Sequence, residues 1–170
     1  MNLASFLPWL VVVHVLSVLG FVALHGPSMV AAFQLRNERD PARVRGVLDQ
    51  SGISIGAMYL FLALLVLSGI AAGIAGGYFT SGQLWIWTAI VVLIVVIGGM
   101  YGLATRHFIA LREAAGSTSR DDREIGRTGT GVADEARLAE LLASPRPLAV
   151  AAVGIVGLAI IAWLMVMKPF

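Results

Sequence analysis

Four long apolar runs alternate with polar links along the chain of 170 residues. The runs predict helices over about residues 5–35, 52–75, 84–111 and 148–167. Roughly 20 predominantly apolar residues suffice to cross a bilayer, so each run is long enough to span a membrane. We therefore predict an all-α fold, an integral membrane four-helix bundle that forms a single transmembrane domain over residues 1–170, with loops at 36–51 and 112–147.

The polar loops contain segments with helical patterns of their own. Asp40 followed by Pro41 is typical of an N-cap and a first helical position, which predicts a short surface helix over Pro41–Gln50. The stretch Ala133–Ala143 places its leucines on one side and its charges elsewhere, which predicts a second surface helix. Residues 116–131 are rich in Gly, Ser, Thr, Asp and Arg, so we expect a flexible loop there.

The two predicted surface helices share a sequence pattern. Residues 40–49 are Asp-Pro-Ala-Arg-Val-Arg-Gly-Val-Leu-Asp, and residues 134–143 are Asp-Glu-Ala-Arg-Leu-Ala-Glu-Leu-Leu-Ala. Each follows an odd-numbered apolar run and precedes an even-numbered one, as in a 2+2 pseudo-repeat about an axis along the membrane normal. Chance similarity between two surface helices rich in Ala, Leu and Arg explains the pattern equally well.

Basic residues are distributed unevenly between the two sides of the predicted bundle. The loops 36–51 and 112–147 carry ten of the twelve Lys and Arg residues, whereas the link 76–83 has no charge. The ten are Arg36, Arg39, Arg43, Arg45, Arg112, Arg120, Arg123, Arg127, Arg137 and Arg146. The positive-inside rule places these loops in the cytoplasm, so we expect both termini to lie outside.

The composition agrees with a membrane protein and excludes several kinds of site. The chain is 58% hydrophobic and 13% charged, whereas a soluble domain carries about a quarter charged residues. The absence of cysteine excludes disulfides, thiolate zinc sites, cysteine-ligated iron–sulfur clusters and covalent c-type haem. No catalytic set, metal motif or nucleotide-binding loop stands out, so we nominate no catalytic residue and expect lipid, not nucleic acid, as a partner.

The first apolar run carries two histidines on one face. At about 100° per residue, His14, Ser17, Phe21, His25 and Ser28 fall within one arc. Polar side chains are costly in lipid, so we expect this stripe to face the bundle interior. Haem ligation, quinone contact or proton transfer is the functional interpretation, since neutral imidazole binds iron and titrates near neutrality. We prefer the second interpretation, in which the histidines form hydrogen bonds that fix the packing of the helices.

A bis-histidine haem needs a second histidine at the same depth. His14 has none, and His25 could meet His107 only if a kink at Pro27 displaces the first helix. His107 follows Arg106 at the expected headgroup level, where we favour an interfacial anchoring role. Binding of a five-coordinate haem b by His14 alone remains an alternative.

Glycines recur at a spacing typical of close helix packing. Gly69, Gly73 and Gly77 are four residues apart in the second predicted helix, and Gly98 and Gly102 are four apart in the third. Small residues at this spacing let helix backbones approach closely. We therefore expect helices two and three, or two copies of the chain, to pack through these glycines.

Three motifs carry a resemblance to known membrane proteins. They are His14-Val-Leu-Ser17, His25-Gly-Pro27-Ser28 and Arg36…Asp40-Pro-Ala-Arg43. With them, roughly residues 8–112 resemble uncharacterised bacterial four-helix membrane proteins, which are distantly similar to the copper-resistance-D family and to HemJ-type protoporphyrinogen oxidases. The resemblance implies a bacterial inner-membrane location, with several membrane passes. In HemJ-type enzymes an early histidine of the first helix is tied to haem b, and His14 is the position that matches.

The chain also departs from the HemJ pattern. Val11-Val12-Val13 precede His14, where that pattern has a lysine close to its histidine, and Gly26-Pro27-Ser28 stands in place of Leu-Pro-Arg. The chain also lacks a Met- or His-rich copper-binding segment outside the apolar runs. The resemblance therefore supports the architecture and does not transfer oxidase activity or copper transport.

The favoured function is that of a non-enzymatic membrane protein that acts through helix packing, as a homo-oligomer or as an accessory subunit of a larger membrane complex. The alternative is a haem-b redox or haem-handling protein that uses His14 and His25. Transport of a small neutral or anionic solute has only the polar stripe in its favour. No apolar run holds a carboxylate for ion coupling.

Overall fold

Helices make up all the regular structure in the described residues, which are 3–53, 55–117 and 131–170 of this computed structural model. Four stretches are long and apolar enough to cross a membrane: Ala4–Leu35, Pro41–Ala75, Leu84–Ala114 and Glu135–Met167. The predicted all-α fold with four membrane-spanning segments is therefore confirmed. The chain is a multi-pass membrane protein.

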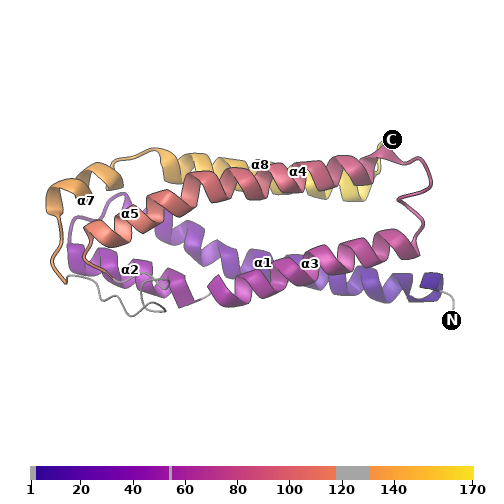
Figure 1. Ribbon diagram of the computed structural model, residues 1–170, viewed down its shortest axis with the longest axis horizontal. Helices are drawn as coiled ribbons and strands as arrows, with labels where there is room; N and C mark the ends of the chain where they lie inside the picture. The colour runs from indigo at the N-terminus through magenta and orange to yellow at the C-terminus, as the bar shows by residue number, and fades with distance from the viewer. Residues whose placement is uncertain (1–2, 54, 118–130) are drawn as a thin grey trace. The chain divides into compact units, whose positions relative to one another are not determined.

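The elements follow the order of the apolar runs, with two surface helices between them (Figure 1). They are η1 (Leu3–Phe6), α1 (Leu7–Leu35), α2 (Pro41–Ile53), α3 (Ile55–Ala75), α4 (Leu84–Met100), η2 (Tyr101–Thr105), α5 (Arg106–Ala114), α7 (Glu135–Leu142) and α8 (Arg146–Met167). The third span differs from a simple α-helix, since η2 is a π-helical turn between α4 and α5. The loop expected over residues 116–131 lies largely outside the described residues.

Both surface helices begin at an aspartate cap. Asp40 accepts a hydrogen bond from the backbone N–H of Ala42 at 2.9 Å, and Asp134 accepts one from the N–H of Arg137 at 3.0 Å. Each carboxylate satisfies a backbone donor that the first helical turn leaves free. The aspartate before each helix therefore explains where α2 and α7 start.

The chain divides into two compact units. The first unit comprises Met1–Gly26, Ser54–Val96 and Ile155–Phe170, and the second comprises Pro27–Ile53 and Ile97–Gly154. Along α1 the division falls at Pro27, which removes a backbone donor from the helix. Each unit has its own cluster of buried apolar side chains.

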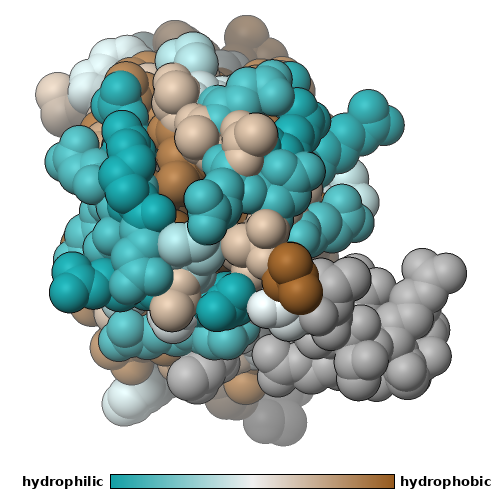
Figure 2. Space-filling model, turned by 90° about the vertical axis from the view of Figure 1, so that its left-hand side faces the viewer, coloured by the Kyte–Doolittle hydropathy of each residue, from teal (hydrophilic) through white to brown (hydrophobic). Residues whose placement is uncertain are grey.

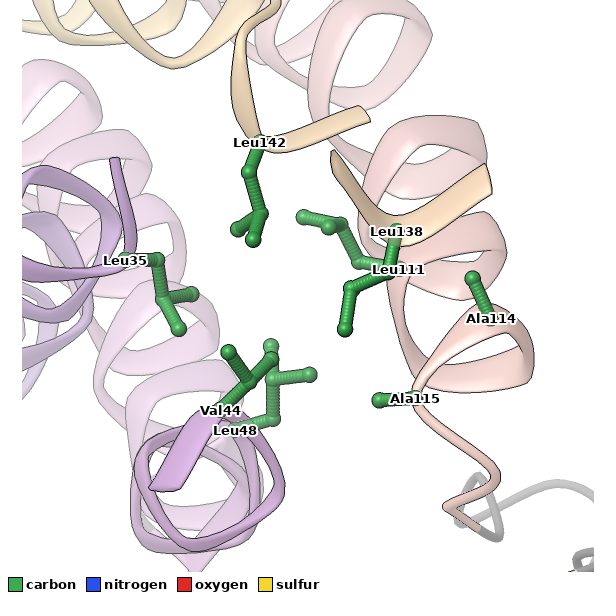
Figure 3. Close-up of a cluster of buried hydrophobic side chains, with 8 residues drawn as sticks. All are labelled: Leu35, Val44, Leu48, Leu111, Ala114, Ala115, Leu138 and Leu142. Carbon is green, nitrogen blue, oxygen red and sulfur yellow. The ribbon is translucent and has the colours of Figure 1, made fainter. Parts of the chain in front are cut away.

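The second unit is built around a cluster that joins α1, α2, α5 and α7, which we call the α2–α7 cluster. Its side chains converge on one centre (Figure 3) and are Leu35, Val44, Leu48, Leu111, Ala114, Ala115, Leu138 and Leu142. The surface outside this end of the unit is largely hydrophilic (Figure 2). An apolar cluster beneath a hydrophilic surface is typical of protein in contact with water. Burial of apolar area stabilises this cluster.

Arginines fasten α2 to α5 at the edge of the α2–α7 cluster. The Arg112 guanidinium donates to the carboxylate of Asp49 at 3.2 Å and to the backbone carbonyl of Leu48. The Arg45 guanidinium donates to the carbonyl of Ala115 at 2.9 Å. The bond to Ala115 satisfies a carbonyl at the end of α5, and the bonds of Arg112 join α5 to α2.

In the first unit, α4 and α8 share a cluster formed by Trp85, Ile86, Ala89 and Leu164. The indole N–H of Trp85 donates to the side chain of Gln83 at 2.8 Å, and its backbone N–H donates to the carbonyl of Phe170. The ammonium of Lys168 lies 5.5 Å from the centroid of the Trp85 ring. These contacts tie the end of the chain to the start of α4.

Candidate functional site

His14 lies on α1 against α3 in the first unit. Its Nδ1 is 3.0 Å from the backbone carbonyl oxygen of Leu65 and 3.3 Å from Oγ of Ser68. Because a carbonyl only accepts, Nδ1 carries the proton and donates it to Leu65. The lone pair of the neutral ring is then on Nε2.

A glycine makes room for the His14 ring. A Cβ built on Gly69 of α3 would lie 3.0 Å from Cε1 and 3.2 Å from Nδ1 of His14. Any larger residue at position 69 would push the imidazole away from the Leu65 carbonyl. One helical turn further along α1, Ser17 is 3% exposed and donates to the carbonyl of Val13 at 2.7 Å. The polar stripe therefore lies within packed protein around His14.

His25 has different neighbours from His14. Its ring stacks on Phe21 with the centroids 5.5 Å apart, and its Nδ1 is 3.1 Å from Sδ of Met58 on α3. Eleven residues separate the two histidines, about 16 Å along a helix. They therefore form two separate local sites and do not bind one ligand atom together.

The residues that contact the histidines leave different marks in the sequence. Ser68 is a polar residue in an apolar run, so the sequence offered a signal that it contacts another polar group. The Leu65 carbonyl belongs to the backbone, and Met58 is an ordinary apolar residue in a span. Sequence patterns therefore identify the histidines on α1 more readily than their partners on α3.

Of the predicted row Gly69, Gly73 and Gly77, only the first two glycines lie on α3. Gly73 faces the turn and α4, since a Cβ there would lie 2.6 Å from the Phe79 ring and 3.1 Å from Cδ1 of Ile86. The placement of Gly77 on the helix is wrong, because α3 ends at Ala75 and Gly77 lies in the following turn with φ of +67°. Glycine adopts that conformation without strain.

Gly98 and Gly102 differ from the glycines of α3. A Cβ built on either one meets no atom within 4 Å among the described residues. Gly98 is in α4 and Gly102 is in the π-helical turn η2, and Tyr101 beside them is 67% exposed. Their surface is open in the single chain.

His107 is buried in the second unit, with 1% of its surface exposed. Phe108 contacts its ring edge-on at a centroid distance of 5.5 Å. An interfacial anchor usually leaves its polar end accessible to the headgroup region, whereas the ring of His107 is enclosed by protein. The depth of His107 in the membrane stays a prediction.

The next question is which side chains could bind a metal ion or the iron of a haem. Within the described residues, no group of three or more His, Asp or Glu side chains is placed to hold a metal ion. His14 would suit a single haem-binding histidine, because an iron-binding histidine commonly donates its other N–H to a backbone carbonyl. Its Nε2 would bind the iron, and haem would supply one-electron chemistry there. No protein-family model, no curated protein and no solved structure matches the chain.

Proposed function

We propose that this protein is a non-enzymatic membrane protein that self-associates through the face of Gly98 and Gly102. The observation that carries the proposal is that no described residue covers either glycine. Lipid tails are as apolar as leucine, so apolar side chains gain little from leaving them. A groove of small residues gains close backbone contact when a second helix fills it.

A second copy of the chain is the occupant to which we commit. Two rows of small residues are complementary to each other, so the same face on both copies forms a two-fold interface. Tyr101, 67% exposed beside the glycines, supplies a large ring and a hydroxyl for the same contact. The chain's apolar runs hold no carboxylate, which favours packing over proton or cation transfer as the role of the spans.

Leucine at position 98 is expected to reduce the dimeric fraction in lipid vesicles by about tenfold or more, the effect of 1.4 kcal/mol. The measurement is single-molecule photobleaching of the labelled full chain at low density, for the wild type and for Gly98→Leu. Gly46→Leu is the matched control, since a Cβ on Gly46 also meets nothing within 4 Å but belongs to α2. A wild type that is monomeric at all densities refutes self-association, and a co-purifying membrane protein would then support the accessory-subunit role.

We place the arginine-rich loops on the cytoplasmic side of a bacterial inner membrane and both termini outside. The contrast between ten basic residues in these loops and none in residues 76–83 supports this orientation. Alkaline phosphatase fused to the C-terminus is expected to be active, because the enzyme needs the oxidising outer compartment. An inactive phosphatase fusion together with a fluorescent cytoplasmic reporter at the same end would reverse the orientation.

A haem-b protein is the second candidate function. The hydrogen bond from Nδ1 of His14 to the Leu65 carbonyl favours it, because this bond leaves Nε2 with the lone pair that iron binds. The resemblance of the first run to HemJ-type enzymes at His14 supports the same assignment. Absorption spectra of the wild type and of His14→Ala test it.

A further inference from the structure

His107 is a buried polar residue of the second unit. Both ring nitrogens are buried, and neither has a hydrogen-bond partner among the described residues. Leaving one such group unpaired costs about 1–3 kcal/mol. A ring with two unpaired nitrogens therefore indicates a polar partner beyond the residues that the structure describes.

A small cavity borders the His107 ring. Its volume is about 10 Å³, enough for one oxygen-sized group. Arg36, the residue that follows α1, is the other polar residue that lines it, and apolar side chains of α1, α5 and α7 with Pro147 complete the wall. The cavity thus has a polar corner and an otherwise apolar wall.

The charged groups described at this cavity are arginines. Arg146, at the start of α8, directly precedes Pro147, which lines the cavity. Several described arginines of the second unit bind carboxylates or carbonyls, such as Arg112 with Asp49. Arg36 and Arg146 make no ion pair with any residue that the structure describes. Among the described residues no carboxylate lines the cavity, so the preferred ligand is an anion.

The depth of the pocket points to a lipid. The helix α8 has 22 residues and is about 33 Å long, close to the thickness of the hydrocarbon core. From this length we expect Arg146, at the first position of α8, to lie at the level of the phosphate groups. Basic pockets between membrane helices bind anionic headgroups at this level. The apolar walls, including Leu141 and Leu142, suit the carbon atoms next to a lipid phosphate.

We propose that His107, Arg36 and Arg146 bind the phosphate group of an anionic phospholipid. One phosphate oxygen enters the cavity and accepts the N–H of His107, while the two guanidinium groups bind the remaining oxygens. A zwitterionic lipid is disfavoured because its ammonium group would lie beside two arginines. The site is separate from the face of Gly98 and Gly102 and does not depend on self-association.

The test compares lipids on the full chain in a mild detergent. Native mass spectrometry counts bound phosphatidylglycerol and phosphatidylcholine over a titration, for the wild type and for His107→Phe, Arg36→Gln and Arg146→Gln. Each substitution is expected to weaken phosphatidylglycerol binding about fivefold, the typical contribution of one basic group near anionic lipid. Arg39→Gln is the control, since it removes a charge from the same loop without bordering the cavity.

Two further arms make the result decisive. Arg36→Lys keeps the charge and is expected to retain most of the binding, which separates a binding defect from misfolding. Inorganic phosphate at matched concentration is expected not to displace the lipid, and displacement would assign the site to free phosphate and overturn the lipid assignment. Equal binding of the two lipids, or unchanged binding in His107→Phe, would overturn the site itself.

Discussion

Replacing Leu48 by alanine is expected to make a buried thiol in the second unit react about 100-fold faster. The chain has no cysteine, so Val44→Cys, at a position with 0% exposure, places a single reporter thiol inside the α2–α7 cluster. Leu48 is 1% exposed in the same cluster. Truncating such a leucine costs about 3 kcal/mol, which corresponds to about two powers of ten in the population of the open form.

The control for this prediction is a leucine truncation on a lipid-facing surface. Leu67 on α3 is 64% exposed, and Leu67→Ala in the same Val44→Cys background removes a similar volume. We expect its maleimide labelling rate to stay within about threefold of the parent, because no core contact is lost. If both truncations accelerate labelling equally, the α2–α7 cluster does not hold the second unit together.

Loss of the His14 imidazole is expected to abolish the Soret band of the protein purified from haem-replete cells. The second candidate function requires this result, because Nε2 of His14 is the nitrogen that the Leu65 hydrogen bond leaves free for iron. The measurement is the oxidised and dithionite-reduced absorption spectrum of the wild type and of His14→Ala. Added imidazole is expected to restore part of the band in His14→Ala by replacing the missing ligand.

His25→Ala is the matched control for the haem prediction. It removes a histidine from the same face of α1 about 16 Å away, so it is expected to leave the spectrum unchanged. A wild type without a Soret band rejects the haem function. His14 would then be a packing residue whose contacts are the carbonyl of Leu65 and the space above Gly69.

Local patterns predicted the spans and the starts of the surface helices. The four apolar runs are long enough that hydropathy alone identifies them. Asp40 and Asp134 precede α2 and α7, and a side-chain cap acts within a few residues of itself. Features that depend only on neighbours in the sequence were therefore accessible without a structure.

Features that depend on distant parts of the chain were not accessible. His107 looked interfacial because it follows Arg106, and its burial arises only when the chain after α5 folds back over it. The π-helical turn η2 has the same apolar composition as an ordinary helical turn, so no hydropathy pattern marks it. At the candidate site, the polar character of His14 and His25 was visible, whereas the partner carbonyl of Leu65 carries no sequence signature.

The turn η2 also sets how the third span is phased. A π-turn closes hydrogen bonds one residue further along than an α-turn, so it acts as one inserted residue. One inserted residue rotates every later side chain by about 100° about the helix axis. The directions of His107 and Leu111 are therefore offset from the helical repeat of α4. The last residues of α4, the turn η2 and α5 all belong to the second unit, so this change of phase lies within one unit and aims the buried face of α5.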